Sequence, residues 1–598
     1  MGISYLTRHL LPYAETVSFG SNNNTSLPGP YQQNVVIDGP SLVYDVYHRL
    51  LANMHPGCDI LDVQPTCNEV SRGFVAFLCK LDKLGVEVKG ICFDGALPVS
   101  KRSTRLSRVE KSRKKLELCR RQVLSTKTRT ECRREMSSDV IFAQIWNSAR
   151  SLPARWKNLP ENPFMVSAVF EDLLNRWSRE EVLREFGVRL DARLPDEYPW
   201  ANVTVMVAGE ADIECARVAR STNSAILTSD SDLLVHDLGV AGSVVFLNSL
   251  QLTESTEGSN QASNLSLCGQ GITPHDLCRH LGMPNIQRFA YELLTDPHAP
   301  FSKLLRLAKE YKYGDDEKRS VEYCDFLREY ECGSGPTFNA ASKGEDEKLF
   351  TQGMDPRVSE LFWQFVSPET YTQASQFHVY LGVLHEDSSR RCAWEQSRFY
   401  RSLGYAILNL SRRAIAAHES EPQAQTVYEF VRRGTRIVAE QITLAGEKTV
   451  FSDLDCLQRR LDLARSTFTF DDASNSNSSS TFWFLFALAE VYHELSNTAT
   501  PPTAKHLQGF LSKGFMGKAT DWGDIHLLAQ IQAVLYSLRM LQQLLQIAAK
   551  TYDLGVYRDI LKDLPPLYLL MKSRHDMVQG FSQENCRKVV HQMIKTYG

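Results

Sequence analysis

The sequence has no pair of cysteines at CxxC spacing, although it contains 14 cysteines in 598 residues. Scattered cysteines argue against a zinc ribbon and against a disulfide scaffold. The first residues, MGISYLTRHLLPYAE, show no basic stretch followed by an apolar run, so we expect no signal peptide. Together these features predict an intracellular protein whose thiols are reduced.

No apolar run is long enough to span a bilayer. The most apolar stretch, TFWFLFALAEVYHEL from Thr481, is interrupted by Glu490, and this predicts a buried helix instead. We therefore expect no membrane association. A strong excess of positive charge is also missing, because the formal net charge is −3. Any surface that binds nucleic acid must therefore be local.

Apolar segments typical of buried strands are present in the first 250 residues. The first four are 34–38, 86–94, 203–210 and 224–230, and a fifth is 243–249. The segments that follow the first and third, SLVYDVYHRLLANM and ADIECARVARS, have helical spacing. Continuous apolar strands that alternate with helices predict an α/β fold with a parallel, twisted central sheet and helices on both faces.

Each of the first four strand segments ends in an acidic residue, namely Asp38, Asp94, Glu210 or Asp230. A single acid in this position is often only a helix N-cap. Parallel strands point the same way, however, and ligands bind at their carboxyl ends. The four acids should therefore gather at one edge of the sheet. The full predicted cluster also includes the acids two residues further on in two of the segments: Asp38, Asp94, Glu210, Asp212, Asp230 and Asp232.

Six carboxylates at one edge repel one another unless cations neutralise them. Oxygen ligands suit Mg²⁺ or Mn²⁺, and up to two such ions can assist the displacement at a phosphodiester. Calcium is the alternative, but no EF-hand spacing is present. A dinucleotide site is disfavoured, because no GxGxxG follows any of the strands. The cluster thus predicts metal-assisted phosphoryl chemistry.

A basic insertion follows Asp94. Residues 101–134 contain 14 Lys and Arg against three Glu, a local charge of 14 − 3 = +11. A basic helix beside a metal cluster suits a polyanion, and Lys101 and Arg108 are the best candidates for phosphate contacts. A solvated basic helix or a nuclear localisation signal, KSRKK from Lys111, is the alternative. The predicted nucleic-acid contacts in this segment are Lys101, Arg102, Arg105, Arg108, Lys111 and Arg113.

The second half of the chain has a different spacing of apolar residues. From about residue 300 the pattern is helical, including 426–442, 453–466 and 525–552, and no catalytic motif is visible. DDASNSNSSS, residues 471–480, predicts a disordered linker. We predict a nuclease-type domain over 1–300, with a basic and helical insertion at about 101–200. A mostly α-helical region over 301–598 then offers a surface for protein partners. Residues 251–266 predict a flexible polar loop.

Ordered motifs in the first half resemble the XPG/flap-endonuclease superfamily, most closely its Asteroid-type branch. The motifs are MGISYL, VVIDGPSLVYDVYH, CFDGALPVSKRSTRLSR, VAGEADIECARVA, LTSDSDLLV and GITPHDLCRHLG. The resemblance implies a PIN-like nuclease domain that cuts branched DNA, or junctions of single and double strands, with two divalent ions. It also implies a nuclear protein of DNA repair that prefers DNA to RNA.

The resemblance carries the metal-binding acids onto the six carboxylates named above. It carries the catalytic basic pair onto Lys101 and Arg108, and it places an N-terminal Gly2 beside the site. One departure concerns a seventh acid, because Pro284 stands where the family pattern has Asp. The glycine-rich hairpin motif that grips duplex DNA is also missing. Glu292 or Asp296 could replace the lost ligand.

Three hypotheses therefore stand beside one another. The first is a divalent-metal-dependent, structure-specific nuclease. The second is a catalytically weak or inactive XPG-like scaffold that binds nucleic acid and has a regulatory role. The missing seventh acid and the large helical region favour this second hypothesis. The third is a purely protein-binding module, which should have no affinity for nucleic acid at low salt.

Overall fold

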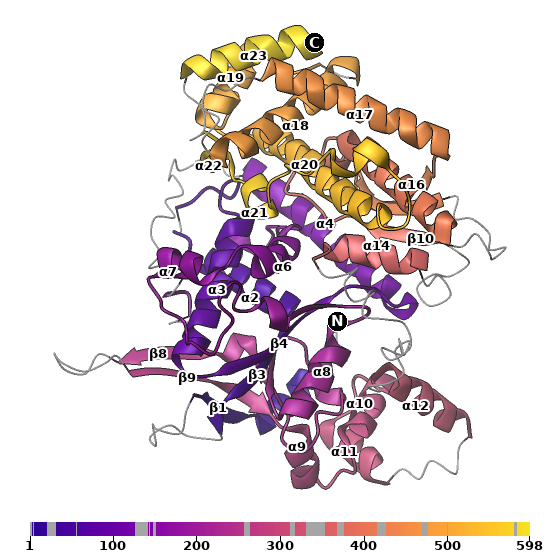
Figure 1. The fold of residues 1–598 in the computed structure, drawn as a ribbon. Helices are drawn as coiled ribbons and strands as arrows, with labels where there is room; N and C mark the ends of the chain where they lie inside the picture. The colour runs from indigo at the N-terminus through magenta and orange to yellow at the C-terminus, as the bar shows by residue number, and fades with distance from the viewer. Residues whose placement is uncertain are drawn as a thin grey trace.

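A computed structural model gives the fold of the chain (Figure 1). The structure describes residues 3, 5–20, 31–55, 57–125, 142, 144–146, 151–255, 264–310, 317–330, 353–366, 376–415, 426–468, 476–498, 500–578 and 583–598. None of the helices in these ranges is long and apolar enough to cross a membrane.

The five predicted strands form the parallel centre of the main sheet. They are β3 (Asn34–Asp38), β4 (Glu87–Asp94), β5 (Thr204–Val207), β6 (Ala225–Thr228) and β7 (Ser243–Phe246). Their order in the sheet is β7-β6-β3-β4-β5, and every neighbouring pair is parallel. The predicted α/β fold with a parallel central sheet is therefore confirmed.

Four further strands extend this sheet beyond β7. They are β1 (Glu15–Phe19), β2 (Tyr31–Gln32), β8 (Gln251–Ser255) and β9 (Asn264–Ile272). β9 pairs antiparallel with β7, β1 and β8. The prediction of a flexible loop over 251–266 is wrong at both ends, because they form the paired strands β8 and β9. The polar composition misled us, since strands near a sheet edge tolerate polar side chains on their solvent face.

Helices cover both faces of the main sheet because the side chains of each strand alternate. Val35 and Ile37 of β3 pack in one core with α2 (Gly39–Asn53) and α3 (Cys67–Lys83). Val36 points the other way, into a core with α8. The helices of this second face are α8 (Ala211–Thr222), α9 (Pro274–Leu281), α10 (Ile286–Thr295), α11 (Phe301–Glu310) and α12 (Glu317–Tyr330). The core on this second face thus includes side chains as far along the chain as Tyr330.

The C-terminal half is a helical layer built around one small sheet, and Figure 1 shows it stacked on the first half. Its helices include α14 (Pro356–Val366), α16 (Arg398–Ile415), α17 (Glu447–Thr467), α18 (Ser476–Thr498), α20 (Trp522–Ala548) and α21 (Leu567–Leu570). The predicted helical C-terminal region is confirmed. The predicted linker at 471–480 is wrong from Ser476 onward, because α18 begins there; residues 471–475 lie outside the described residues.

A second correction concerns residues 426–442, which the spacing predicted as a helix. They form the hairpin β11 (Thr426–Arg433) and β12 (Arg436–Thr443), and β11 pairs in parallel with β10 (Phe377–Tyr380). Gly434 in the turn has a φ of +56°, a conformation that glycine adopts at little cost. Along the first six residues of β11, half-buried side chains alternate with buried ones, which is the period of two of a strand.

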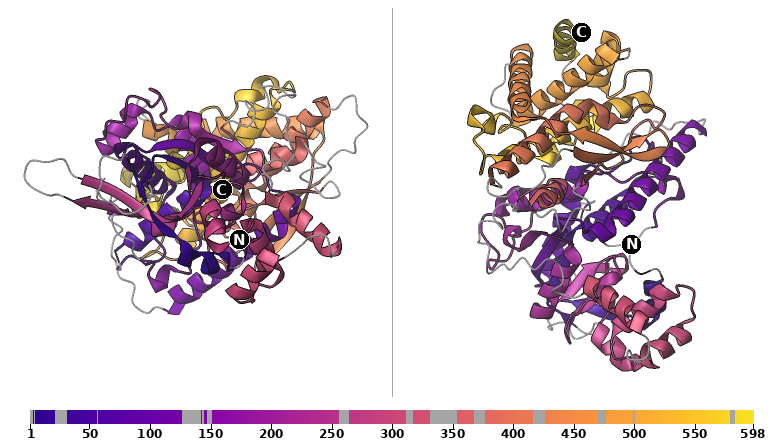
Figure 2. Two further views of the ribbon diagram at one scale, coloured as in Figure 1. Left: turned by 90° about the horizontal axis from the view of Figure 1, so that it is seen from below. Right: turned by 90° about the vertical axis from the view of Figure 1, so that its right-hand side faces the viewer.

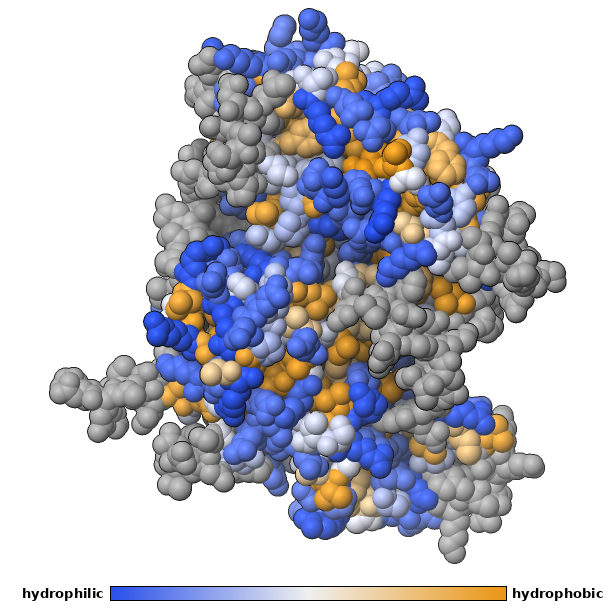
Figure 3. Space-filling model, viewed as in Figure 1, coloured by the Kyte–Doolittle hydropathy of each residue, from blue (hydrophilic) through white to orange (hydrophobic). Residues whose placement is uncertain are grey.

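The two halves share an interface with apolar and polar contacts, and Phe164 and Ala168 of the first half lie in the core of the C-terminal half. The basic helix α4 (Arg102–Ser125) belongs to the first half of the chain and packs against β10 and β12 of the second half (Figure 2, right). Arg120 on α4 bonds Asp387 at 2.7 Å, and the backbone N–H of Leu567 donates to Glu171 at 2.9 Å. The surface in Figure 3 is mainly hydrophilic over both halves, with small scattered apolar spots.

Candidate functional site

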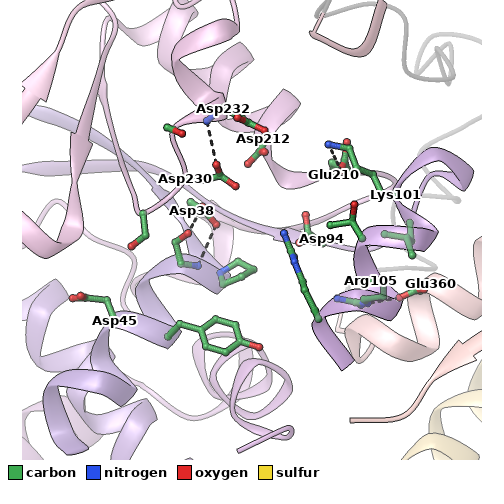
Figure 4. Close-up of a pocket in the computed structure, with 18 of the residues that line it drawn as sticks. Asp38, Asp45, Asp94, Lys101, Arg105, Glu210, Asp212, Asp230, Asp232 and Glu360 are labelled. Carbon is green, nitrogen blue, oxygen red and sulfur yellow. Dashed lines mark hydrogen bonds and ion pairs between the residues drawn. The ribbon is translucent and has the colours of Figure 1, made fainter. Parts of the chain in front are cut away.

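The carboxyl ends of β3, β4, β5 and β6 open into one cavity of about 700 Å³. All six predicted acids line it, and we call it the acidic cavity (Figure 4). Its lining also includes basic side chains from the start of α4. The charged side chains that line it are Asp38, Asp45, Asp94, Lys101, Arg105, Arg108, Glu210, Asp212, Asp230, Asp232 and Glu360.

Asp38 both caps a helix and lines the cavity. Its carboxylate accepts hydrogen bonds from the N–H and hydroxyl of Ser41, at 3.3 and 2.5 Å, and from the hydroxyl of Thr228 at 2.7 Å. The next residue is Gly39, where a Cβ would lie 2.7 Å from the ring of Phe93 on β4. The Asp-Gly sequence thus lets α2 start against the sheet while the carboxylate stays at the strand end.

Three of the other acids accept hydrogen bonds from backbone N–H groups. Asp94 accepts the N–H of Ala211 at 2.8 Å, which ties the end of β4 to the start of α8. Asp232 accepts the N–H of Ile3 at 2.5 Å, and Asp230 accepts the N–H of Asp232 at 3.1 Å. Asp212 lies in the first turn of α8. These bonds fix the acids on rigid elements.

Burial and mutual repulsion favour the protonated form of several of these acids. Burial raises the pKa of Asp38 to about 6, opposed by the hydroxyls of Ser41 and Thr228. Burial and the charge of Asp230 raise the pKa of Asp232 to about 6. For Asp212, burial and then the neighbouring carboxylates raise the pKa well above its usual range. The cavity therefore holds more negative charge than its own cations neutralise.

Lys101 is the cation nearest to the acids. Its Nζ lies 3.6 Å from Glu210 Oε1. Burial lowers the pKa of Lys101, but the charges of Glu210 and Asp232 outweigh burial and raise it, so the side chain stays charged. Arg105 and Arg108 lie one and two turns further along α4 and also line the cavity. Arg105 is held by Glu360 at 3.1 Å.

The rest of the basic helix does not all face the cavity. Arg113 is buried and bonded to Glu110 and Glu117 at 2.7 and 3.0 Å and does not line the cavity, and its phosphate contact stays a prediction. Lys111 is exposed but does not line the cavity. Arg102 is half-buried on the side of β10. Gly2 lies outside the described residues.

Neither candidate for the seventh acid reaches the cavity. Glu292 is buried in α10, and Asp296 at the end of that helix is exposed and bonds Lys303 at 2.9 Å. Neither residue belongs to the cavity lining, and Pro284 also lies outside it. The site therefore contains the six strand-end acids without the family's seventh ligand.

Among the lining residues that the sequence did not predict are Tyr44, Asp45 and Glu360. Asp45 and Tyr44 lie on α2 and follow Asp38 at helical spacing, a signal that could have placed them on the same face. Tyr44 is 43% exposed. Glu360 comes from α14 and is buried beside Arg105. No local pattern could have revealed Glu360, because the chain brings it from 255 residues beyond Arg105.

The donor set of the cavity fits a hard divalent cation. All six ligand candidates offer carboxylate oxygens, which Mg²⁺ and Mn²⁺ prefer. Among the residues that the structure describes, no three acidic, histidine or cysteine side chains approach closely enough to enclose a single ion. Like charges separate when nothing lies between them, so a bound ion would draw the carboxylates together.

Comparison with known proteins agrees with this geometry. The model of a family described as XPG domain containing matches residues 161–444, which include four of the six acids and Glu360. No curated protein matches the sequence. The match does not distinguish the Asteroid-type branch from others. Over the matched residues the chain is therefore similar to proteins that contain an XPG domain.

Proposed function

We propose that the protein is a divalent-metal-dependent, structure-specific nuclease that hydrolyses phosphodiesters in DNA at flaps or at junctions of single and double strands. One observation carries the proposal. A single cavity at the carboxyl edge of a parallel sheet combines six acids with Lys101, Arg105 and Arg108. A cluster of acids alone would suit many metal ions. Acids that lie beside basic side chains can hold metal ions while the basic side chains bind the phosphate that is attacked.

The six acids would hold up to two Mg²⁺ or Mn²⁺ ions. Such ions polarise a phosphoryl oxygen and lower the pKa of a bound water. The chain itself binds and orients the substrate. Lys101 and Arg108 are the residues that contact the scissile phosphate, while Glu360 fixes the direction of the Arg105 guanidinium. Tyr44 lines the cavity and is partly exposed.

The proposal also covers location and partners. We propose that the protein acts in the nucleus, in DNA repair, and that its helical C-terminal half contacts protein partners. DNA is the proposed substrate in preference to RNA. These statements rest on the family resemblance and on the basic segment, whose KSRKK run could also serve nuclear import.

The test compares cleavage of flap, splayed-arm and single-stranded DNA with Mg²⁺ or Mn²⁺. Asp230→Ala should lower the cleavage rate by at least about 10- to 100-fold, because loss of a residue that merely supports a metal ligand already costs that much. Asp237→Ala is the matched control from the same stretch, since Asp237 is exposed and bonded to Arg220 at 2.6 Å. Equal rates for the wild type and Asp230→Ala on every substrate would refute the proposal.

A second candidate is a scaffold that binds nucleic acid without cutting it. The observation in its favour is that neither Glu292 nor Asp296 supplies the seventh acid. The two candidates differ in metal binding. Calorimetric titration with Mn²⁺ should show binding that Asp212→Asn weakens if the protein is a nuclease. Affinity for DNA in EDTA without any uptake of Mn²⁺ would favour the scaffold.

A further inference from the structure

The small sheet in the C-terminal half has one face that carries aromatic rings. In β10 and β11, Phe377, Val379 and Val427 point into the core of that half. Because strand residues alternate, their neighbours point to the opposite face. The register pairs His378 with Tyr428 and Tyr380 with Phe430, so four rings share this face.

The four rings form a contiguous cluster. The Tyr380 and Phe430 rings stack, with centroids 4.6 Å apart and an interplanar angle of 11°. The His378 ring meets Phe430 at 5.2 Å and Tyr428 at 5.9 Å, in both cases edge to face. Tyr380 is buried, whereas His378, Tyr428 and Phe430 are each partly exposed. We call these three partly exposed residues the aromatic platform.

The aromatic platform is joined to the acidic cavity by the first turn of α4. Arg102 directly follows Lys101 of the cavity, and its charge acts on both Tyr380 and His378. Arg105 lies one turn later in α4. It lines the cavity and forms an ion pair there with Glu360. α4 itself packs against β10 and β12, so the cations and the rings lie on adjoining elements (Figure 2, right).

We propose that the aromatic platform stacks the bases of a single-stranded nucleic acid as the strand enters or leaves the acidic cavity. The inference rests on the proposed nuclease function and names the form of substrate. Arg102 and Arg105 face the phosphates between cavity and platform, and the rings take the bases. Every base has a π-face, so such a platform accepts any sequence.

The chemistry of the platform favours bases over a protein segment. Burial and the charge of Arg102 lower the pKa of His378 to about 4, so its ring is neutral at physiological pH and can stack. Tyr428 is partly exposed, and its hydroxyl makes no hydrogen bond to any residue within the described ranges. Flat rings beside guanidinium groups match a strand of alternating bases and phosphates.

The test measures the affinity of the full chain for a fluorescent single-stranded DNA oligonucleotide, and for an abasic strand of the same length, both in EDTA. The wild type should prefer the strand that carries bases. Tyr428→Ala should weaken binding of that strand by about 5- to 150-fold, the effect of losing one stacked base, and leave the abasic strand unchanged. Tyr428→Phe should restore affinity. Tyr198→Ala, at a half-buried tyrosine outside both sites, is the matched control.

The outcomes separate this inference from the proposed function. Because EDTA removes divalent ions, the assay reports on the platform whether or not the protein cuts DNA. Binding that depends on Tyr428 without any cleavage in Mg²⁺ would support the platform and refute the nuclease. Cleavage with unchanged affinity of Tyr428→Ala would refute the platform alone. An equal loss for the base-bearing and abasic strands would also overturn the platform, since only stacking distinguishes them.

Discussion

The molecule buries acidic side chains in two regions and neutralises them in different ways. In the C-terminal half, Glu429 on β11 accepts hydrogen bonds from Arg401 at 2.6 and 2.9 Å and from Tyr405 at 2.7 Å, with both members of the ion pair almost fully buried. Glu386 is bonded by the buried Arg432 at 2.8 Å. Glu429 and Glu386 thus each have their own arginine.

The acidic cavity has no such balance. Among the described residues, its six strand-end acids share one ion pair, between Lys101 and Glu210. An acid that already has an arginine needs no further cation, so the C-terminal pairs serve to hold the fold. Acids without a partner destabilise the fold until a cation binds, which is the usual property of a functional site. The comparison therefore separates structural from functional carboxylates.

The largest expected effect comes from breaking a buried ion pair of the C-terminal half. Arg401→Met leaves Glu429 buried without its cation and should lower the free energy of unfolding by about 3–5 kcal/mol, measured by urea denaturation. Arg433→Met is the control, because Arg433 is 42% exposed in its ion pairs with Glu395 and Glu440 and should cost less than about 1 kcal/mol. Similar losses for both variants would contradict the assignment of Arg401 to the core.

A smaller effect should appear in the pH dependence of stability without divalent ions. The pKa of Asp38 is about 6 in the folded protein and lies near 4 in an unfolded chain. The folded state therefore binds the Asp38 proton more tightly than the unfolded chain does. The stability that this binding contributes is fully present below about pH 4. It is lost as the pH rises towards 6, at a cost of about 2–3 kcal/mol. Asp232 should contribute in the same direction.

Urea denaturation in EDTA between pH 4 and 7 checks this expectation. Asp38→Asn removes the titrating group while keeping an oxygen for Ser41 and Thr228, so its stability should fall less over that window. Adding Mg²⁺ should also flatten the curve of the wild type, because a cation favours the ionised acids. Parallel curves of unfolding free energy against pH for the wild type and Asp38→Asn would show that ionisation of Asp38 does not destabilise the fold.

The smallest effect compares two arginines of one helix. Arg108 lines the cavity, whereas Arg113 is bonded to Glu110 and Glu117. Arg108→Gln should reduce the salt dependence of DNA binding by about one unit of slope, because one phosphate contact is lost. Arg113→Gln should leave that slope unchanged and lower stability. Anisotropy titrations at several salt concentrations measure the slope, and an equal change in both variants would refute the distinction.

Much of the main sheet could be predicted because its signals are local. Buried parallel strands read as continuous apolar runs, and helical spacing marks α2 and α8 between them. The strands β8 and β9 were missed because their composition is polar. The hairpin 426–443 was mistaken for a helix because apolar residues also recur at helical spacing there, and tertiary packing against α16 decided between the two periods.

The sequence by itself determined that six acids follow strands and that parallel strands bring such acids to one edge. That inference needs only the direction of the strands and the period of the pattern. Only the tertiary structure decided which cations face the acids. It buried Arg113, turned Arg105 towards Glu360 from α14, and left Asp296 on the surface with Lys303. Contacts between residues hundreds of positions apart depend on how the two halves pack, and no local pattern encodes them.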